Sequence, residues 1–161
     1  HLFPGLEEAR YSEVSARYSY HFLAGNHRVQ PFEGARQLLE DLNAAGYVVA
    51  IATGKSRRGL DRSLEQSGLA RFFHATRCAD EGFPKPHPEM LEFLMETLGV
   101  TRRRTLMIGD TTHDLQMANN AGVPAIAVGY GAHPREELES MDPLACMASF
   151  PELLKWLTQN A

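Results

Sequence analysis

Short apolar runs alternate with amphipathic segments along most of this chain, and this alternation constrains the fold more than any other feature. The clearest run, residues 47–52 (YVVAIA), is nearly unbroken and rich in β-branched residues, as expected of a strand covered on both faces. Strands that alternate with helices of ten to twelve residues predict right-handed crossovers. The predicted fold class is therefore α/β, a three-layer Rossmann-like parallel sheet with helices on both faces.

Periodicity and helix-end signals give approximate bounds for the elements. Glycines that favour helix ends follow several amphipathic stretches, at Gly46, Gly68, Gly99 and Gly122. The predicted helices cover residues 6–23, 34–45, 57–67, 88–98 and 112–121, with a closing helix around residues 153–157. The predicted strands cover residues 47–52, 72–77, 105–108, 125–128 and 144–148, of which 72–77 has the weakest pattern.

Charge and composition exclude several classes of protein. The net charge is −4 and no basic block is present, which argues against nucleic acid as a partner. No apolar run approaches the roughly 20 residues that a membrane-spanning helix needs, so we expect no membrane partner. Cys78 and Cys146 are too few for a disulfide framework and fit a reducing compartment, which together with the lack of an export signal predicts a cytoplasmic protein.

Polar residues follow the predicted strands at the places where ligands bind in parallel sheets. Thr53 follows the run YVVAIA, Lys85 lies in the loop FPKPHP, and Asp110 and Asp114 follow the run TLMI within GDTTHD. The two aspartates are four residues apart at a helix start and can share a face, where paired carboxylates suit Mg²⁺. Helix capping is the alternative for them, and a solvated side chain is the alternative for Lys85.

Two further motifs fail on spacing, and the remaining reactive side chains suggest structural roles. Residues 54–56 (GKS) end like a nucleotide-binding phosphate loop, but Val49 stands where that loop needs glycine. A dinucleotide fingerprint fails likewise after Gly129-Tyr130-Gly131, because proline occupies the third glycine's place. His87 and His113 lie beside the predicted ligand site and could touch a substrate, but the main expectation for each is a surface side chain. Cys78 is expected to be a packed thiol.

In order, the segments IATGKS, FPKPHPEM and LMIGDTTHDLQMANNAG resemble three signature motifs of the haloacid dehalogenase-like hydrolases, particularly the phosphoglycolate phosphatase-like branch. The resemblance covers the chain from about Pro31 onward. It implies a core domain over residues 30–161 that lacks its first strand, and a helical cap remnant over residues 1–29. It also implies that the missing strand belongs in the middle of the sheet, beside the strands YVVAIA and TLMI.

The resemblance implies a site for phosphoryl transfer. Thr53, with the backbone N–H groups of Gly54 and Lys55, would bind the phosphoryl oxygens, and Lys85 would neutralise their charge. Asp110 would bind Mg²⁺ with help from Asp114. In the family, an aspartate attacks phosphorus and forms an aspartyl phosphate that water hydrolyses. The implied function is a magnesium-dependent phosphatase acting on a small phosphomonoester, for example a phosphoglycolate-like metabolite.

The sequence departs from the family pattern at the attacking aspartate, because no two aspartates of this chain form an Asp-x-Asp pair. The sequence also begins with His1 instead of Met. We expect the nucleophile to lie upstream of His1 and the 161-residue chain alone to be inactive. A non-catalytic phosphate-binding or regulatory relative of the same fold is the main alternative, and a dehalogenase, which has no use for magnesium, is a weaker one. The expected partner is a small phosphorylated metabolite, and the expected assembly is a monomer or homodimer.

Overall fold

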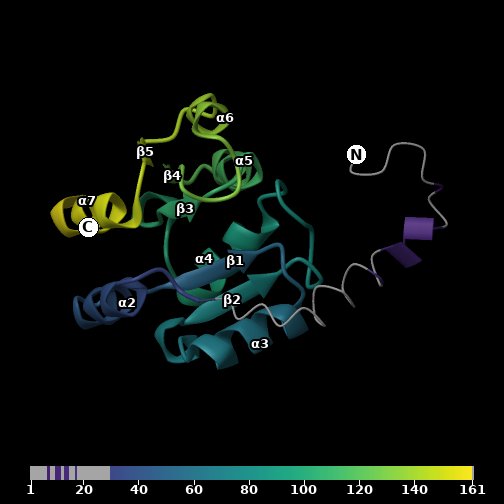
Figure 1. Ribbon diagram of the computed structural model, residues 1–161, viewed down its shortest axis with the longest axis horizontal. Helices are drawn as coiled ribbons and strands as arrows, with labels where there is room; N and C mark the ends of the chain where they lie inside the picture. Colours follow the sequence, from purple (N-terminus) through teal and green to yellow (C-terminus); the bar gives the residue numbers. More distant parts are fainter. Residues whose placement is uncertain (1–6, 8–9, 12, 15–16, 18–29, 161) are drawn as a thin grey trace. The chain divides into compact units, whose positions relative to one another are not determined.

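The computed structural model describes residues 7, 10, 11, 13, 14, 17 and 30–160 of the chain (Figure 1). The chain divides into two compact units, residues 1–30 and residues 31–161. The predicted helix at residues 6–23 and the interpretation of residues 1–29 as a cap remnant fall mostly outside the described residues. Both therefore stay predictions, and the description that follows concerns the second unit.

The second unit contains short parallel strands connected by helices (Figure 1). Its strands are β1 (Ala50–Thr53), β2 (Ala75–Cys78), β3 (Met107–Gly109), β4 (Ala125–Val128) and β5 (Ala145–Met147). Its helices are α2 (Ala35–Ala44), α3 (Arg57–Ser67), α4 (Glu89–Leu98), α5 (Thr112–Ala121), α6 (Arg135–Glu139) and α7 (Phe150–Asn160). Two 3₁₀ helices, η2 (Ala70–Phe72) and η3 (Arg102–Arg104), complete it. None of the described helices is long and apolar enough to cross a lipid bilayer.

The strands form two parallel sheets with helices on both sides, which confirms the predicted fold class. In one sheet β1 pairs with β2, in a register that places Thr53 opposite Cys78. In the other, the order is β3-β4-β5, and Ile108 lies opposite Ile126. Within residues 30–160, β1 and β3 each have one paired edge and no strand between them. This is the place where the resemblance puts the absent first strand.

Strand β4 is the most deeply buried strand, because apolar helices cover both of its faces. Successive side chains of a strand point to opposite faces. Ala125 and Ala127 accordingly join a cluster with residues of α4, α5 and α6, whereas Ile126 and Val128 join a second cluster with Leu153 and Leu157 of α7. The two clusters form the apolar core of this sheet.

The sequence locates several element boundaries closely. Helices α3 and α5 and strand β4 have the predicted bounds. Ser56 caps α3 by accepting a hydrogen bond from the Gly59 N–H group, and Gly68 ends that helix with a φ of 64°. Thr111 begins α5 with a capping box in which its hydroxyl and the Asp114 carboxylate accept each other's backbone N–H bonds. These boundaries are local, so sequence alone indicates them.

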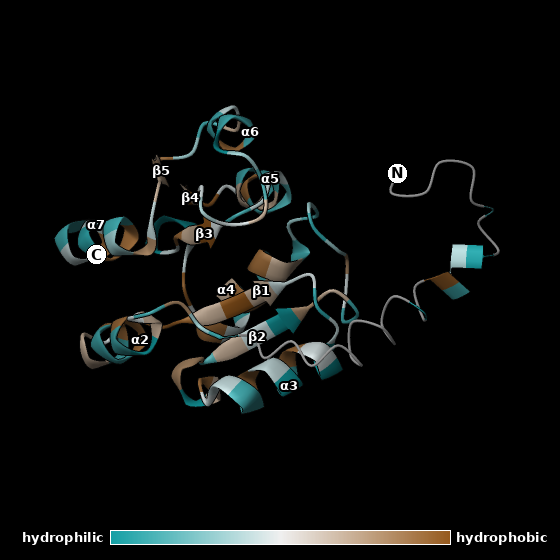
Figure 2. Cartoon of the chain, viewed as in Figure 1, coloured by the Kyte–Doolittle hydropathy of each residue, from teal (hydrophilic) through white to brown (hydrophobic). Residues whose placement is uncertain are grey.

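Other boundaries were predicted less well. The strand predicted at residues 47–52 begins three residues later than expected, and its predicted burial on both faces is wrong. β1 begins at Ala50, Tyr47 and Val48 are 42% and 48% exposed, and all four residues of β1 are only partly buried. The open edge of β1 explains this, because no strand covers that side among residues 30–160. The strand predicted at residues 72–77 is likewise shifted to β2, since η2 occupies its first residue. Figure 2 shows β1 coloured mostly as apolar, whereas α3 is coloured mostly as polar.

Candidate active site

The two sheets present polar residues at the carboxyl ends of their strands, as the sequence predicts. Thr53 is the last residue of β1, and Asp110 directly follows β3. Lys85 lies in the loop between β2 and α4, and its peptide bond to Pro86 is cis. Asp114 lies in the first turn of α5. The site residues therefore come from both sheets and from the loop that follows β2.

The Lys85 ammonium group contacts both β1 and the first turn of α5, the helix that follows β3. Its Nζ atom donates to the carbonyl oxygen of Ala52, the residue before Thr53, at 3.0 Å. It also lies 2.5 Å from Oδ1 of Asp114, and the two side chains are only 16% and 5% exposed. A charge-assisted contact with so little solvent is stronger than a surface ion pair. The structure thus brings Lys85 together with Asp114 and with the end of β1.

Asp114 is the only buried charged side chain among the described residues, with 4% exposure. Its Oδ1 atom contacts Lys85, while its Oδ2 atom accepts hydrogen bonds from the Thr111 N–H group at 3.1 Å and the Thr111 hydroxyl at 2.7 Å. Gly109 packs against it so closely that an added Cβ atom would collide with the Asp114 side chain. Both carboxylate oxygens therefore already have protein partners.

Asp110 is half-buried and lies under the loop at residues 129–134. Its Oδ2 atom accepts a hydrogen bond from the Ala132 N–H group at 3.0 Å, and its carbonyl accepts one from the His133 N–H group at 3.1 Å. Gly131 leaves room for it, since a Cβ atom there would collide with the Asp110 side chain. Burial raises the pKa of the neighbouring Tyr130, and the negative charge of Asp110 adds to that rise.

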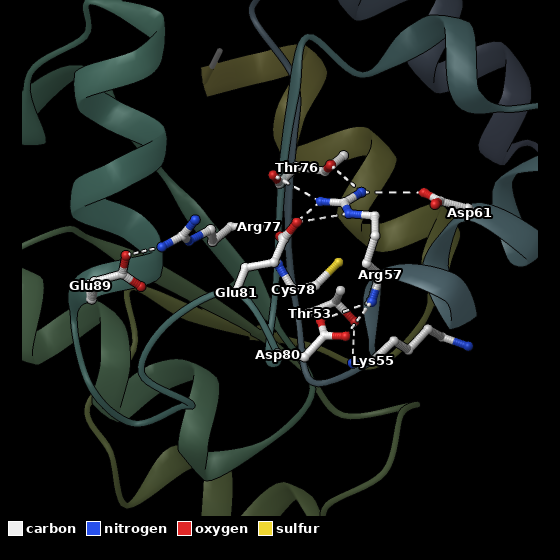
Figure 3. A network of polar contacts seen from close by, with 10 residues as sticks. All are labelled: Thr53, Lys55, Arg57, Asp61, Thr76, Arg77, Cys78, Asp80, Glu81 and Glu89. Atoms are coloured by element: carbon white, nitrogen blue, oxygen red, sulfur yellow. Dashed lines mark hydrogen bonds and ion pairs between the residues drawn. The ribbon is translucent and has the colours of Figure 1, made fainter. Parts of the chain in front are cut away.

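The loop at residues 53–56 combines a folded turn with an exposed glycine. The Thr53 hydroxyl accepts a hydrogen bond from the Lys55 N–H group at 3.2 Å, and the space around Gly54 is open. The Lys55 ammonium donates to the Ser63 hydroxyl at 3.3 Å, along α3. Figure 3 shows the Lys55 side chain directed away from Thr53. The open space at Gly54 therefore leaves room for an anion beside this turn, away from the Lys55 side chain.

The donor set fits Mg²⁺ through Asp110 better than through a pair of aspartates. Among the described residues, no group of three or more His, Cys, Asp or Glu side chains could hold a metal ion. Magnesium does not need such a group, because it binds one or two carboxylates together with waters and phosphate oxygens. Asp110 uses Oδ2 for a single backbone bond, whereas both oxygens of Asp114 are engaged. The pairing of Asp110 with Asp114 as metal ligands stays a prediction.

A network of charged side chains beside this site was missed by the sequence analysis (Figure 3). Arg57, at the start of α3, binds both carboxylate oxygens of Glu81 at 2.9 Å. This contact lowers the pKa of Glu81 to about 2 and raises the pKa of Arg57. The pair is separated by 24 residues, so no local spacing indicated it; the only signal was an acidic dipeptide, Asp80-Glu81, after a strand.

The secondary candidates lie where the sequence predicted. His87 and His113 are exposed, and His87 stacks on Phe83 with ring centroids 4.5 Å apart. Cys78 is fully buried, and burial raises the pKa of its thiol, as expected of a packed side chain and not of a nucleophile. Neither cysteine forms a disulfide.

Comparison with known proteins places these residues among phosphatase-like sequences. The family model described as haloacid dehalogenase-like hydrolase matches residues 4–128. Pyrophosphatase PpaX of Halalkalibacterium halodurans is 34% identical over 154 residues, which is 94% of this chain and 72% of the relative. Phosphoglycolate phosphatase of Vibrio parahaemolyticus is 34% identical over 128 residues, which is 78% of this chain and 56% of the relative.

A solved structure with the same fold contains an anion. The crystal structure of a hydrolase of this family from Deinococcus radiodurans, with bound phosphate and sodium, matches with a TM-score of 0.73 and 26% identity. The match covers 80% of this chain and 59% of that protein. This chain therefore spans between about half and three quarters of the length of the proteins compared.

Proposed function

Since this chain belongs to the haloacid dehalogenase-like hydrolases, we propose that it supplies the phosphate-binding and metal-binding half of a magnesium-dependent phosphatase. The observation that carries the proposal is the position of Lys85, whose ammonium lies between the end of β1 and the buried Asp114. An ammonium fixed at the meeting point of two sheets is suited to neutralise a phosphoryl group held by the adjacent loop.

The role of each residue follows from its contacts. The Thr53 hydroxyl and the N–H groups of Gly54 and Lys55 bind phosphoryl oxygens, and Lys85 balances their charge. Asp110 binds Mg²⁺ directly, and Asp114 acts mainly by holding Lys85 and the start of α5. When bound, Mg²⁺ polarises phosphoryl oxygens and neutralises the charge that develops on them. These are the electrostatic parts of the reaction.

The attacking group is proposed to come from outside the 161 residues. The family's Asp-x-Asp motif is absent from this sequence. Within residues 30–160, β1 and β3 each have an unpaired edge, which supplies a second reason, because a strand between them would end beside Thr53 and Asp110. We propose that such a strand carries the aspartate that forms the aspartyl phosphate, and that the chain alone turns over no phosphate ester.

The proposed substrate is a small phosphorylated metabolite. The relatives compared above are named as a pyrophosphatase and a phosphoglycolate phosphatase, so both a diphosphate and a small phosphomonoester belong in the test. We favour the phosphomonoester, of the phosphoglycolate-like kind, because of the branch resemblance. A cytoplasmic location and a monomeric or homodimeric assembly are part of the same proposal.

A second candidate function is a non-catalytic phosphate-binding module. The observation that favours it is the same lack of an Asp-x-Asp motif in the sequence. Retention of Thr53, Lys85, Asp110 and Asp114 at one edge favours the phosphatase. The gene region before the codon for His1 separates the two: an apolar strand followed by Asp-x-Asp-Gly-Thr supports the phosphatase, and its absence supports the binding module.

The proposal is tested by measuring phosphate release from phosphoglycolate, pyrophosphate and a panel of other phosphomonoesters, with and without Mg²⁺. The 161-residue chain should release none but should bind inorganic phosphate, seen as shifts of the Gly54 and Lys55 amide signals in NMR. A chain extended by an upstream Asp-x-Asp segment should be active only with Mg²⁺. Robust turnover by the 161-residue chain would exclude an external nucleophile, and absence of phosphate binding would exclude the proposed site.

A further inference from the structure

Arg57 is fully occupied by partners within the protein, which separates it from the residues that could bind phosphate. A guanidinium group has five N–H donors. Two of them bind the oxygens of Glu81, two bind the hydroxyl and carbonyl of Thr76, and one binds Asp61. Figure 3 shows these contacts converging on the guanidinium from β2, α3 and the loop after β2. The Arg57 guanidinium therefore has a structural role and leaves no N–H donor for a phosphate.

The partners of Arg57 join the two loops that form the proposed phosphate site. Its backbone N–H group donates to Oδ1 of Asp80 at 2.9 Å and to Oδ2 at 3.2 Å. Next to this contact, the Ala79 N–H group donates to the carbonyl oxygen of Lys55 at 3.1 Å. Residues 55–57 are thereby tied to residues 79–81 by backbone and side-chain hydrogen bonds. Lys85 follows four residues after Glu81 on the same loop.

A second ion pair supports the same loop from its other side. Arg77 on β2 binds Glu89 at the start of α4, and its guanidinium lies 4.1 Å from the centroid of the Phe93 ring. Gly82 packs against this pair, since an added Cβ atom would collide with the Glu89 carboxylate. The segment between Glu81 and Glu89 is thus anchored at both ends, and Lys85 lies within it.

We propose that Arg57, Asp80 and Glu81 are positioning residues that hold the loop at residues 53–56 in register with the loop that carries Lys85. The proposal rests on the phosphate-binding role proposed above for Thr53, Gly54 and Lys85. The three residues touch no substrate. They act by fixing the separation between the N–H groups that bind phosphoryl oxygens and the ammonium that balances their charge, because a small misplacement of such groups is costly.

The test compares Glu81→Gln and Arg57→Lys with the control Glu40→Gln. Glu40 forms a single ion pair with Arg71 at 3.2 Å, away from both loops. Affinity for inorganic phosphate is measured by titration of the Gly54 and Lys55 amide signals, and thermal unfolding is measured in parallel. Arg57, Asp80 and Glu81 together are called the brace, and both brace variants, Glu81→Gln and Arg57→Lys, should bind phosphate about tenfold more weakly. The control should stay within about twofold of the wild type. Equal affinities for wild type and brace variants would overturn the proposal.

Two further measurements separate positioning from general stabilisation and from failure of the proposed function. The effect of Glu81→Gln on phosphate affinity should shrink in a Lys85→Ala background, since the brace acts partly through Lys85; an undiminished effect would contradict this. Hydrogen exchange at the Ala79 amide should accelerate in the brace variants and stay unchanged in the control. If the wild-type chain binds no phosphate, the proposed function fails, and this exchange rate alone decides whether the brace orders the loops.

Discussion

The two sheets of this protein are stabilised by different interactions. The β3-β4-β5 sheet is held by apolar packing, with all four residues of β4 buried. The β1-β2 sheet is only partly buried at β1, and its loops are held by Arg57, Glu81 and their partners. The difference indicates that apolar burial defines one half of the site, whereas a polar network orders the other half.

Truncating a buried side chain of β4 should give the largest decrease in the free energy of unfolding. Ile126→Ala should lower the free energy of unfolding by about 4 kcal/mol. Ile126 of β4 is fully buried in the cluster with α7, and the truncation leaves a cavity there. Ile108→Ala, at the paired position on β3, should cost about 1 kcal/mol because Ile108 is 38% exposed. Urea unfolding measures both values. Equal losses would contradict the view that β3 has an open edge.

Loss of the ion pair between Lys85 and Asp114 should give the next largest decrease in the free energy of unfolding. Asp114→Asn should cost about 3 kcal/mol, since it leaves the Lys85 ammonium without its carboxylate in a nearly buried position. The double variant with Lys85→Met should recover part of that loss, because it removes the unpaired charge. Unfolding of the two single variants and the double variant measures the coupling. Strictly additive losses would mean that the pair contributes nothing as a pair.

Acid should weaken the β1-β2 half by a smaller amount. The pKa of Glu81 falls from its ordinary 4.5 to about 2 in the folded state, so its contribution is complete above pH 4.5 and is lost as the pH falls toward 2. Because the side chain is 29% exposed, solvent screening limits that contribution to about 1 kcal/mol. Unfolding at several pH values should show this loss in wild type and not in Glu81→Gln. A wild-type-like acid dependence in the variant would assign the loss to other carboxylates.

The positions of the candidate residues in the fold were predictable where the signal was local, and contacts between distant residues were missed. Thr53, Lys85 and Asp110 follow predicted strands and Asp114 lies one helix turn after Asp110, so local patterns indicated their places, while their roles remain predictions from the family resemblance. Arg57 and Glu81 were missed because their contact depends on how the loop after β2 folds back onto α3. The sequence likewise showed no sign that the two carboxylate oxygens of Asp114 bind different partners, Thr111 and Lys85, because Lys85 is 29 residues away in the chain.

By itself, the sequence determined the parallel α/β class, the bounds of α3, α5 and β4, and the residues at the strand ends. Periodicity and helix caps are local properties, and the chain order of strands limits where ligand groups can lie. Only the tertiary structure decided that, within residues 30–160, β1 and β3 lie in separate sheets with open edges, and that Lys85 contacts both β1 and the start of α5. Those features depend on contacts between residues far apart in the chain, whose geometry no local pattern encodes.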